Sequence, residues 1–152
     1  MTIALVLSLT LVVGTFLFHF MVLRWLSTGM STIAMTPGLR ILIIVLTALF
    51  AHLAEVGIYA VAYALAAEVF RIGAFEGLSV SHPMDYFYFS LVSYTSLGLG
   101  DIFPSEHLRF LTGIEALNGL LLIAWSGSFI YIAMGRLWRW ENCAEPPTQG
   151  KD

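Results

Sequence analysis

Residues 94–101 read YTSLGLGD, with glycine at alternate positions, Gly98 and Gly100. Successive carbonyl groups can point to one side of a strand only if the backbone alternates between ordinary and left-handed conformations, and glycine adopts the left-handed ones most freely. A one-sided row of carbonyl oxygens can replace the water shell of a cation, as it does in an ion-selectivity filter. The stretch therefore predicts a strand that holds cations through its backbone.

The composition is that of an integral membrane protein. Hydrophobic residues make up 59% of the 152 residues and charged residues only 11%, and the mean hydropathy is +0.85. Soluble domains carry about 25% charged residues. The net charge of −3 and the lack of a basic run argue against nucleic acid as a partner. A single cysteine, Cys143, leaves no basis for an internal disulfide or a multi-cysteine metal site.

Three stretches are long enough to cross a bilayer as helices, which takes about 20 apolar residues. They are residues 1–23, 41–67 and 110–135. The first lacks the basic start and small-residue cleavage site of a signal peptide, so we expect it to be retained. A fourth apolar stretch, residues 86–97, is too short to cross and is predicted to enter the membrane and return on the same side.

Basic residues predict the orientation, because cytoplasmic loops of membrane proteins carry an excess of Lys and Arg. Five of the seven lie beside the first linker or after the last span: Arg24, Arg40, Arg136, Arg139 and Lys151. The opposite side carries a set of acidic loop residues that would concentrate cations there: Glu68, Glu76, Asp85, Asp101 and Glu106. We therefore expect the N-terminus outside and the C-terminus in the cytoplasm.

The order of these segments, together with the motif YTSLGLGDIFP, resembles the pore domain of the potassium-channel superfamily. The family filter reads Thr-Thr-Val-Gly-Tyr-Gly-Asp after an aromatic-rich pore helix. The chain matches this pattern at Thr95, Gly98, Gly100, Asp101 and Pro104. The resemblance covers about residues 40–136. It implies an all-α membrane protein with an outer helix, a re-entrant pore helix, a filter strand and an inner helix, preceded by an extra transmembrane helix and assembled as a homotetramer.

On this resemblance the chain divides into four parts. We expect an N-terminal transmembrane helix at 1–24, a cytoplasmic linker at 25–40, the ion-channel pore domain at 41–136 and a polar, disordered cytoplasmic tail at 137–152. Within the superfamily the chain is most similar to small bacterial one-pore channel proteins, which implies the plasma (inner) membrane. The expected partners are three further copies, membrane lipid and permeant monovalent cations.

The resemblance also implies which residues hold the ion. Carbonyl groups and one hydroxyl would bind K⁺ or Na⁺ along the filter at residues 95–101, with no other cofactor or metal. The filter residues are Thr95, Ser96, Leu97, Gly98, Leu99 and Gly100, and Asp101 would anchor the outer end.

Two departures from the family pattern keep the function open. Leu99 replaces the usual Tyr or Phe and cannot donate the hydrogen bond that ties the filter to its surroundings, and Ser96 replaces the inner Thr. We expect a potassium-conducting channel. The alternatives are a weakly selective sodium/potassium channel and a non-conducting membrane subunit that retains the pore fold for assembly or sensing. The sequence contains no nucleophile–base pair or nucleotide loop that would indicate an enzyme.

The second and last predicted spans contain three ionisable residues, His52, Glu55 and Glu115. At a rise of about 1.5 Å per residue, Glu55 lies about 21 Å above the cytoplasmic start of its helix, and Glu115 lies about 8 Å below the outer start of its helix. In a hydrocarbon core about 30 Å thick these depths nearly coincide. We therefore expect one polar network.

Such a network is either a hydrogen-bonded brace for the pore helix, which we favour, or a proton-sensitive switch. A metal site is the weaker interpretation, because the set lacks a cysteine and a second histidine. His19, in the first span, is expected to be interfacial or packed. Asn118 is expected to face an ion cavity. Gly119 is either a gating hinge or a site of close helix packing.

Overall fold

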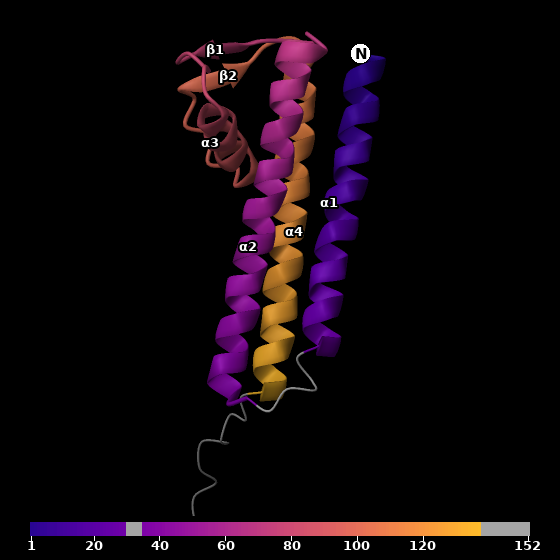
Figure 1. Cartoon of the computed structure of the whole chain (residues 1–152), viewed down its shortest axis with the longest axis vertical. Helices are drawn as coiled ribbons and strands as arrows, with labels where there is room; N and C mark the ends of the chain where they lie inside the picture. The colour runs from indigo at the N-terminus through magenta and orange to yellow at the C-terminus, as the bar shows by residue number, and fades with distance from the viewer. Residues whose placement is uncertain (30–34, 138–152) are drawn as a thin grey trace, which may run out of the picture.

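The computed structural model describes residues 1–29 and 35–137. Three long helices run side by side (Figure 1), and they are α1 (Thr2–Gly29), α2 (Pro37–Ala64) and α4 (Leu108–Leu137). A π-helical turn, η1 (Leu65–Val69), continues α2. Each long helix has the length and hydropathy of a membrane span, which confirms the three predicted spans.

The first two helices extend further than expected. We expected the first to end near residue 24 and the second to begin at 41, but α1 continues to Gly29 and α2 begins at Pro37. Leu26 is only 2% exposed and packs with Leu23 and Ile44, so its burial stabilises the added turn of α1. Pro37 starts α2 because the first turn of a helix does not need its missing N–H. Residues 30–34 and the expected tail after residue 137 lie outside the described residues.

The predicted short helix is present as α3 (Pro83–Tyr94) and begins and ends three residues earlier than expected. It lies beside the upper halves of α2 and α4 in Figure 1. At its start, Asp85 Oδ2 accepts hydrogen bonds of 2.8 Å from the backbone N–H groups of Ser81 and His82. These donors hold the pKa of Asp85 below its ordinary value. The carboxylate therefore stays charged at the positive end of the helix.

A small antiparallel sheet, which the sequence did not predict, joins the loops on either side of α3. Its strands are β1 (Phe75–Gly77) and β2 (Ile102–Pro104). Gly77 has a φ of +95°, and a Cβ there would lie 2.2 Å from the carbonyl oxygen of Asp101. Only glycine allows this approach. The sheet thereby fixes the chain immediately after the candidate filter.

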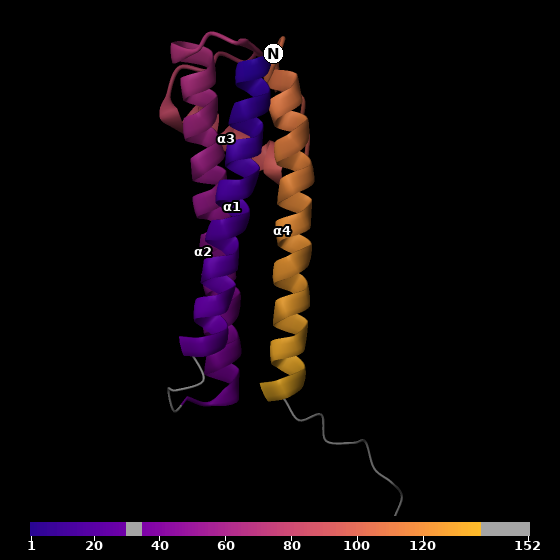
Figure 2. The same ribbon diagram turned by 90° about the vertical axis from the view of Figure 1, so that its right-hand side faces the viewer.

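The core of the upper half is aromatic. The rings of Tyr63, Phe75 and Phe89 pack edge to face, with centroids 4.8–5.7 Å apart. This cluster joins α2, β1 and α3. Helix α1 packs against α2 and α4 on the side away from α3 (Figures 1 and 2).

The two ends of the molecule differ in charge as predicted. Arg24, Arg40 and Arg136 occupy the end where α1 finishes, α2 begins and α4 finishes. The N-terminus lies at the other end, which is also the end that carries β1 and β2 (Figure 1). Asp101 follows the candidate filter at that same end, so the basic and acidic loops are separated by the length of the helices.

Candidate functional site

The segment after α3 has the alternating backbone that the glycine spacing predicts. Ser96, Gly98 and Gly100 have φ values of 57°, 57° and 77°, whereas Leu97 and Leu99, between them, do not have positive φ. Left-handed and ordinary conformations therefore alternate from residue 96 to residue 100. This is the geometry expected of a strand that turns its carbonyl groups to one side.

Ser96 is left-handed because it caps α3. Its N–H donates to the carbonyl of Ser93 at 2.9 Å, and the N–H of Leu97 donates to the carbonyl of Val92 at 2.9 Å. This pair of bonds is the Schellman motif, in which a left-handed residue follows the last turn of a helix. Glycine usually occupies that position, and serine there costs about 1–2 kcal/mol. The two capping bonds compensate for this strain and fix where the candidate filter begins.

One face of the segment is uncovered in the single chain. Leu97 and Leu99 are 63% and 59% exposed. No atom lies within 4 Å of the positions that a Cβ would occupy on Gly98 or Gly100. The segment therefore has an open face in the single chain.

The outer end of the segment is tied back to α3. The hydroxyl of Tyr88 donates to Asp101 Oδ2 at 2.5 Å, and the N–H of Ile102 donates to Oδ1 of the same carboxylate at 3.0 Å. The hydrogen bond from Tyr88 is the main cause that lowers the pKa of Asp101, and it raises the pKa of Tyr88. Asp101 thus remains a carboxylate with two donors. This contact fits the anchoring role expected of it.

Behind the segment lies a buried group of side chains, the Glu55 cluster, formed by His19, His52, Glu55, Tyr94 and Ser126. Glu55 is fully buried, and its Oε1 lies 2.8 Å from His19 Nδ1. Its Oε2 accepts from the hydroxyl of Tyr94 and lies 3.2 Å from His52 Nδ1. His52 Nδ1 is also 2.9 Å from the Tyr94 hydroxyl. The carboxylate therefore joins α1, α2 and the last residue of α3.

Ser126 of α4 closes this cluster into a ring. Its Oγ lies 3.0 Å from His19 Nε2 and 3.1 Å from His52 Nε2. The two imidazole rings are 5.1 Å apart at a tilt of 30°. Both nitrogens of each histidine are thus engaged, one with the carboxylate and one with the serine. Four helices contribute to a single polar ring.

A second group, the Glu115 cluster, is formed by Tyr63, Ser90, Thr112 and Glu115. Tyr63 donates to one carboxylate oxygen of the buried Glu115 at 2.5 Å, and Ser90 donates to the other at 2.5 Å. Thr112 Oγ1 lies 3.0 Å from the Tyr63 hydroxyl. This cluster ties α4 to both α2 and α3.

The expectation of one network through His52, Glu55 and Glu115 is therefore corrected. His52 shares the cluster of Glu55, whereas Glu115 accepts its hydrogen bonds from a separate pair, Tyr63 and Ser90. The depths do nearly match, since Ser90 reaches both Glu115 and the carbonyl of Val56, the residue after Glu55. Depth, however, does not fix the angle around a helix, and the two carboxyls bind different side chains.

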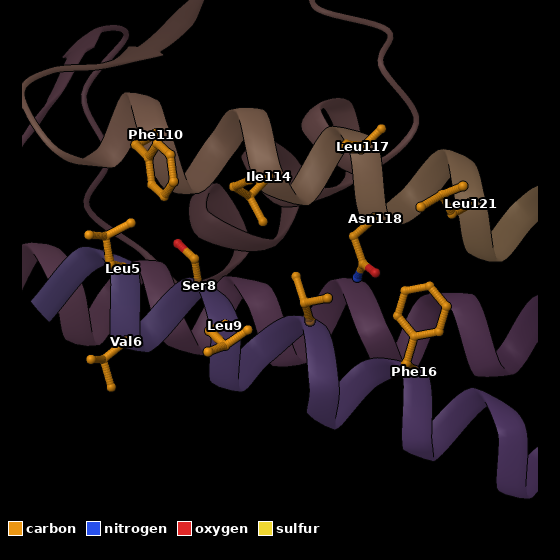
Figure 3. Close-up of a pocket in the computed structure, with 11 residues that line it drawn as sticks. Leu5, Val6, Ser8, Leu9, Phe16, Phe110, Ile114, Leu117, Asn118 and Leu121 are labelled. Atoms are coloured by element: carbon orange, nitrogen blue, oxygen red, sulfur yellow. The ribbon is translucent and has the colours of Figure 1, made fainter. Parts of the chain in front are cut away.

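Asn118 does not take the cavity position expected of it. It is 2% exposed, and its amide nitrogen donates to Thr15 Oγ1 at 2.8 Å and to the Tyr59 hydroxyl at 3.0 Å. Figure 3 shows it pointing from α4 toward α1, beside a groove of about 490 Å³ that is lined mainly by apolar side chains of these two helices. Asn118 is thus a polar contact between helices.

Gly119 takes the close-packing role that we gave as its alternative. A Cβ on this residue would lie 2.2 Å from the carbonyl oxygen of Tyr94. Helix α4 runs through this position from Leu108 to Leu137 as one α-helix. The absent side chain therefore allows α4 to approach the end of α3.

Sequence reasoning missed three members of the Glu55 cluster: His19, Tyr94 and Ser126. A signal for His19 was present, because Ser8, Thr15 and His19 are spaced by seven and four residues and so share one helical face. All three are buried. A polar stripe on an otherwise apolar span predicts the face that packs against other helices.

Comparison with known proteins gives one match. A family model described as an ion channel matches residues 51–136. The match covers more than half of the chain. It includes α3, the candidate filter segment, the buried Glu55 and Glu115 and nearly all of α4, but not α1. No curated protein and no solved structure matches the chain.

Proposed function

This chain belongs to the ion channel family, and from that premise we propose that it is a cation channel whose conducting path is shared by four copies. The family and the three apolar helices make it a membrane protein with a channel pore domain, in a family of channels rather than of enzymes. We assign the ion path to residues 95–100, with Asp101 as the outer anchor. We assign potassium as the permeant ion.

The observation that carries this proposal is the alternating backbone. Positive φ at Ser96, Gly98 and Gly100, with ordinary conformations between, supports a strand whose carbonyls face one axis. Carbonyl oxygens in such a row replace the hydration shell of a cation. One side-chain hydroxyl, from Thr95 or Ser96, would add to these carbonyls, and the permeant cations are the sole ligands that we assign to this site. The assignment therefore rests on backbone geometry, which side-chain substitutions in the family pattern leave intact.

Four copies follow from what the single chain leaves uncovered. One strand offers one row of oxygens, whereas an ion must be surrounded. In a tetramer, side chains pointing away from the axis, such as the exposed Leu97 and Leu99, would pack against neighbouring pore helices. In such a tetramer α3 and the filter would lie toward the axis and α1 at the periphery, because α1 lies on the far side of α2 and α4 from α3 (Figures 1 and 2).

We propose the membrane orientation from the charge distribution. The arginine-bearing end lies in the cytoplasm and the end with the N-terminus, β1 and β2 lies outside. This places the Asp101 end of the filter at the outer mouth. By similarity to small bacterial channel proteins, the membrane is the plasma (inner) membrane.

Leu99 favours a second candidate, a weakly selective sodium/potassium channel. A leucine cannot donate the hydrogen bond that an aromatic hydroxyl would supply at this position. The bond from Tyr88 to Asp101 and the β1–β2 pairing hold the chain after the filter instead. They support an ordered outer end, and for this reason we rank potassium selectivity first.

The test is ion flux in vesicles that contain the purified protein. Potassium-loaded vesicles should show potassium efflux, and reversal potentials should favour potassium over sodium. Equal permeation of both ions would establish the weakly selective channel. No flux from correctly assembled protein would establish the non-conducting subunit.

A further inference from the structure

We propose that His19, His52 and Glu55 form a binding site for a divalent transition-metal ion of the zinc class. The site lies where α1 meets α2, and it is separate from the path of the permeant ions. His19 belongs to α1 and lies outside the family match, whereas His52 and Glu55 belong to α2 and lie inside it. Metal binding at this site does not depend on ion conduction and can be measured separately from it.

The three side chains are already gathered at near-coordinating distances. One ligand atom from each lies within 4.8 Å of the others. The two contacts to the carboxylate measure 2.8 Å from His19 Nδ1 and 3.2 Å from His52 Nδ1. In a tetrahedral site with zinc–ligand bonds of about 2.0–2.1 Å, ligand atoms are about 3.4 Å apart. Small side-chain shifts would therefore admit an ion between the two imidazoles and the carboxylate.

The residue types fit this class of ion. Two imidazoles and one carboxylate make a three-ligand zinc set that keeps a fourth position open. Tyr94, whose hydroxyl is 2.9 Å from His52 Nδ1, borders that open position, which water would fill. The carboxylate is fully buried, and a bound cation would compensate its charge. No Lys or Arg contributes to the cluster among the described residues.

Ser126 supplies the oxygen acceptor to which a metal-binding histidine usually donates its second N–H. A ligating imidazole binds the ion through one nitrogen and donates its other N–H to an oxygen, which fixes the ring. Here the Nε2 atoms of His19 and His52 both face Ser126 Oγ, at 3.0 and 3.1 Å. A hydroxyl oxygen has two lone pairs and can accept both N–H groups. With an ion on the Nδ1 side, both imidazoles are neutral and every hydrogen bond to Ser126 is made.

Without an ion, the hydrogen bonds of this ring depend on which nitrogen of each imidazole carries the hydrogen. If both Nδ1 atoms carry hydrogen to meet the carboxylate, both Nε2 atoms become acceptors, and Ser126 has one proton for the two of them. If instead both Nε2–H groups meet Ser126, both Nδ1 lone pairs face the carboxylate, and a bound cation would stand between them.

Access to the site is through His52. Glu55 and His19 are fully buried, whereas the side chain of His52 is 17% exposed. A bound ion would fasten α1 to α2 beside Tyr94, the last residue of α3. The candidate filter begins directly after this residue, so a bound ion would affect how firmly the end of α3 is held.

The experiment is a cobalt titration of the purified full chain in detergent. The protein carries no polyhistidine tag and is stripped with a chelator first. Tetrahedral Co²⁺ absorbs visible light strongly, so the expected result is an absorption band that saturates at one ion per chain and disappears when Zn²⁺ is added. Zn²⁺ should also raise the thermal unfolding temperature.

Variants locate the site. His19→Gln, His52→Gln and Glu55→Gln should each weaken cobalt binding by about 100-fold or more, and Ser126→Ala should weaken it by about 10–100-fold. Two controls should bind as the wild type does. Glu115→Gln alters a buried carboxyl of the neighbouring cluster, and His107→Gln removes an exposed histidine.

Two results would overturn the proposal. If stripped wild type gives no cobalt band and unfolds at the same temperature with and without Zn²⁺, the ring binds no metal and acts as a brace only. If cobalt binds equally to folded Ser126→Ala, His19→Gln and wild type, the metal lies elsewhere. Ser126→Ala keeps the proposal testable even where a buried histidine variant fails to fold, because it leaves all three ligands in place.

Discussion

The candidate filter and the Glu55 cluster are both polar and both lie within the apolar part of the chain, yet they are completed in opposite ways. The cluster is closed by side chains from α1, α2, α3 and α4. The filter segment leaves Leu97, Leu99 and two glycines uncovered. The hydrogen-bonding side chains of the Glu55 cluster therefore find their partners within one chain, whereas the side chains of the filter segment do not pack against the rest of that chain. This difference is the reason why we propose that further copies cover the filter segment.

The largest effect is expected on ion flux, from a substitution that changes the backbone conformation of the candidate filter. Gly98→Ala should abolish potassium flux, because alanine in the left-handed conformation costs about 1–2 kcal/mol in each of four copies. No neighbouring atom crowds the new Cβ, so folding should survive. Gly14→Ala is the matched control, since Gly14 of α1 also has nothing within 4 Å but lacks a positive φ. Normal selective flux through the Gly98 variant would show that this strand is not the filter.

Removing the central carboxylate of the closed cluster should have the next largest effect. Glu55→Leu removes three hydrogen bonds to one carboxylate, leaves the buried His19 Nδ1 without an acceptor, and leaves Tyr94 and His52 Nδ1 with only each other. Hydrogen bonds to charged groups contribute about 1.5–3 kcal/mol each, so the free energy of unfolding should fall by about 3 kcal/mol or more. Denaturation of the purified protein in detergent measures this loss.

The Glu115 cluster provides the comparison for that variant. Glu115→Leu should destabilise less, by about 1–3 kcal/mol, because Tyr63 retains Thr112 and Ser90 retains the carbonyl of Val56. The double variant with Glu55→Leu should equal the sum of the single effects within about 0.5 kcal/mol, as expected of separate sites. A clear departure from the sum would mean that the two clusters act as one network.

Gly119→Ala tests the contact between the two regions. The added Cβ would meet the carbonyl of Tyr94, so α4 and the end of α3 must move apart. Overpacking of this kind destabilises by about 1–3 kcal/mol. Gly127→Ala, on the same helix and with open space around its Cβ, should be near neutral. If thermal unfolding of the two variants is equal, α4 does not pack on α3 as described.

The smallest effect is expected at the outer anchor. In the folded protein the pKa of Asp101 is lowered from its ordinary value of 3.8, mainly by the hydrogen bond from Tyr88. This hydrogen bond therefore stabilises the fold fully above pH 3.8, and the stabilisation is lost as the pH falls through the lowered pKa. Tyr88→Phe removes the donor and should shift the acid loss of flux to higher pH. Flux measured from about pH 6 to about pH 3 covers the range in which aspartate titrates. If wild type and Tyr88→Phe lose flux at the same pH, Asp101 is held by groups other than Tyr88.

The sequence predicted the features that have a local cause. Length and hydropathy located the three spans and the short helix, and alternating glycines predicted positive φ at Gly98 and Gly100. The third left-handed residue, Ser96, was not predicted, because it depends on where α3 ends. Once the last helical residue is Tyr94, the capping bonds require a left-handed residue two positions later.

The features that were missed depend on contacts between distant segments. The β1–β2 pairing joins two strands of three residues, which are too short to carry a periodic signal. The Glu55 cluster needs the rotation of α1 about its own axis, which hydropathy alone does not give. Asn118 was wrongly expected to face a cavity, because its helical face was known but the place of α1 was not.

The most direct test of the central claim is a density map of the protein purified into lipid nanodiscs in potassium. The account predicts a four-fold axis bordered by the carbonyls of residues 96–100, with ion density between them and α1 at the outer rim. A monomer or dimer whose YTSLGLGD strand faces lipid or solvent would contradict it.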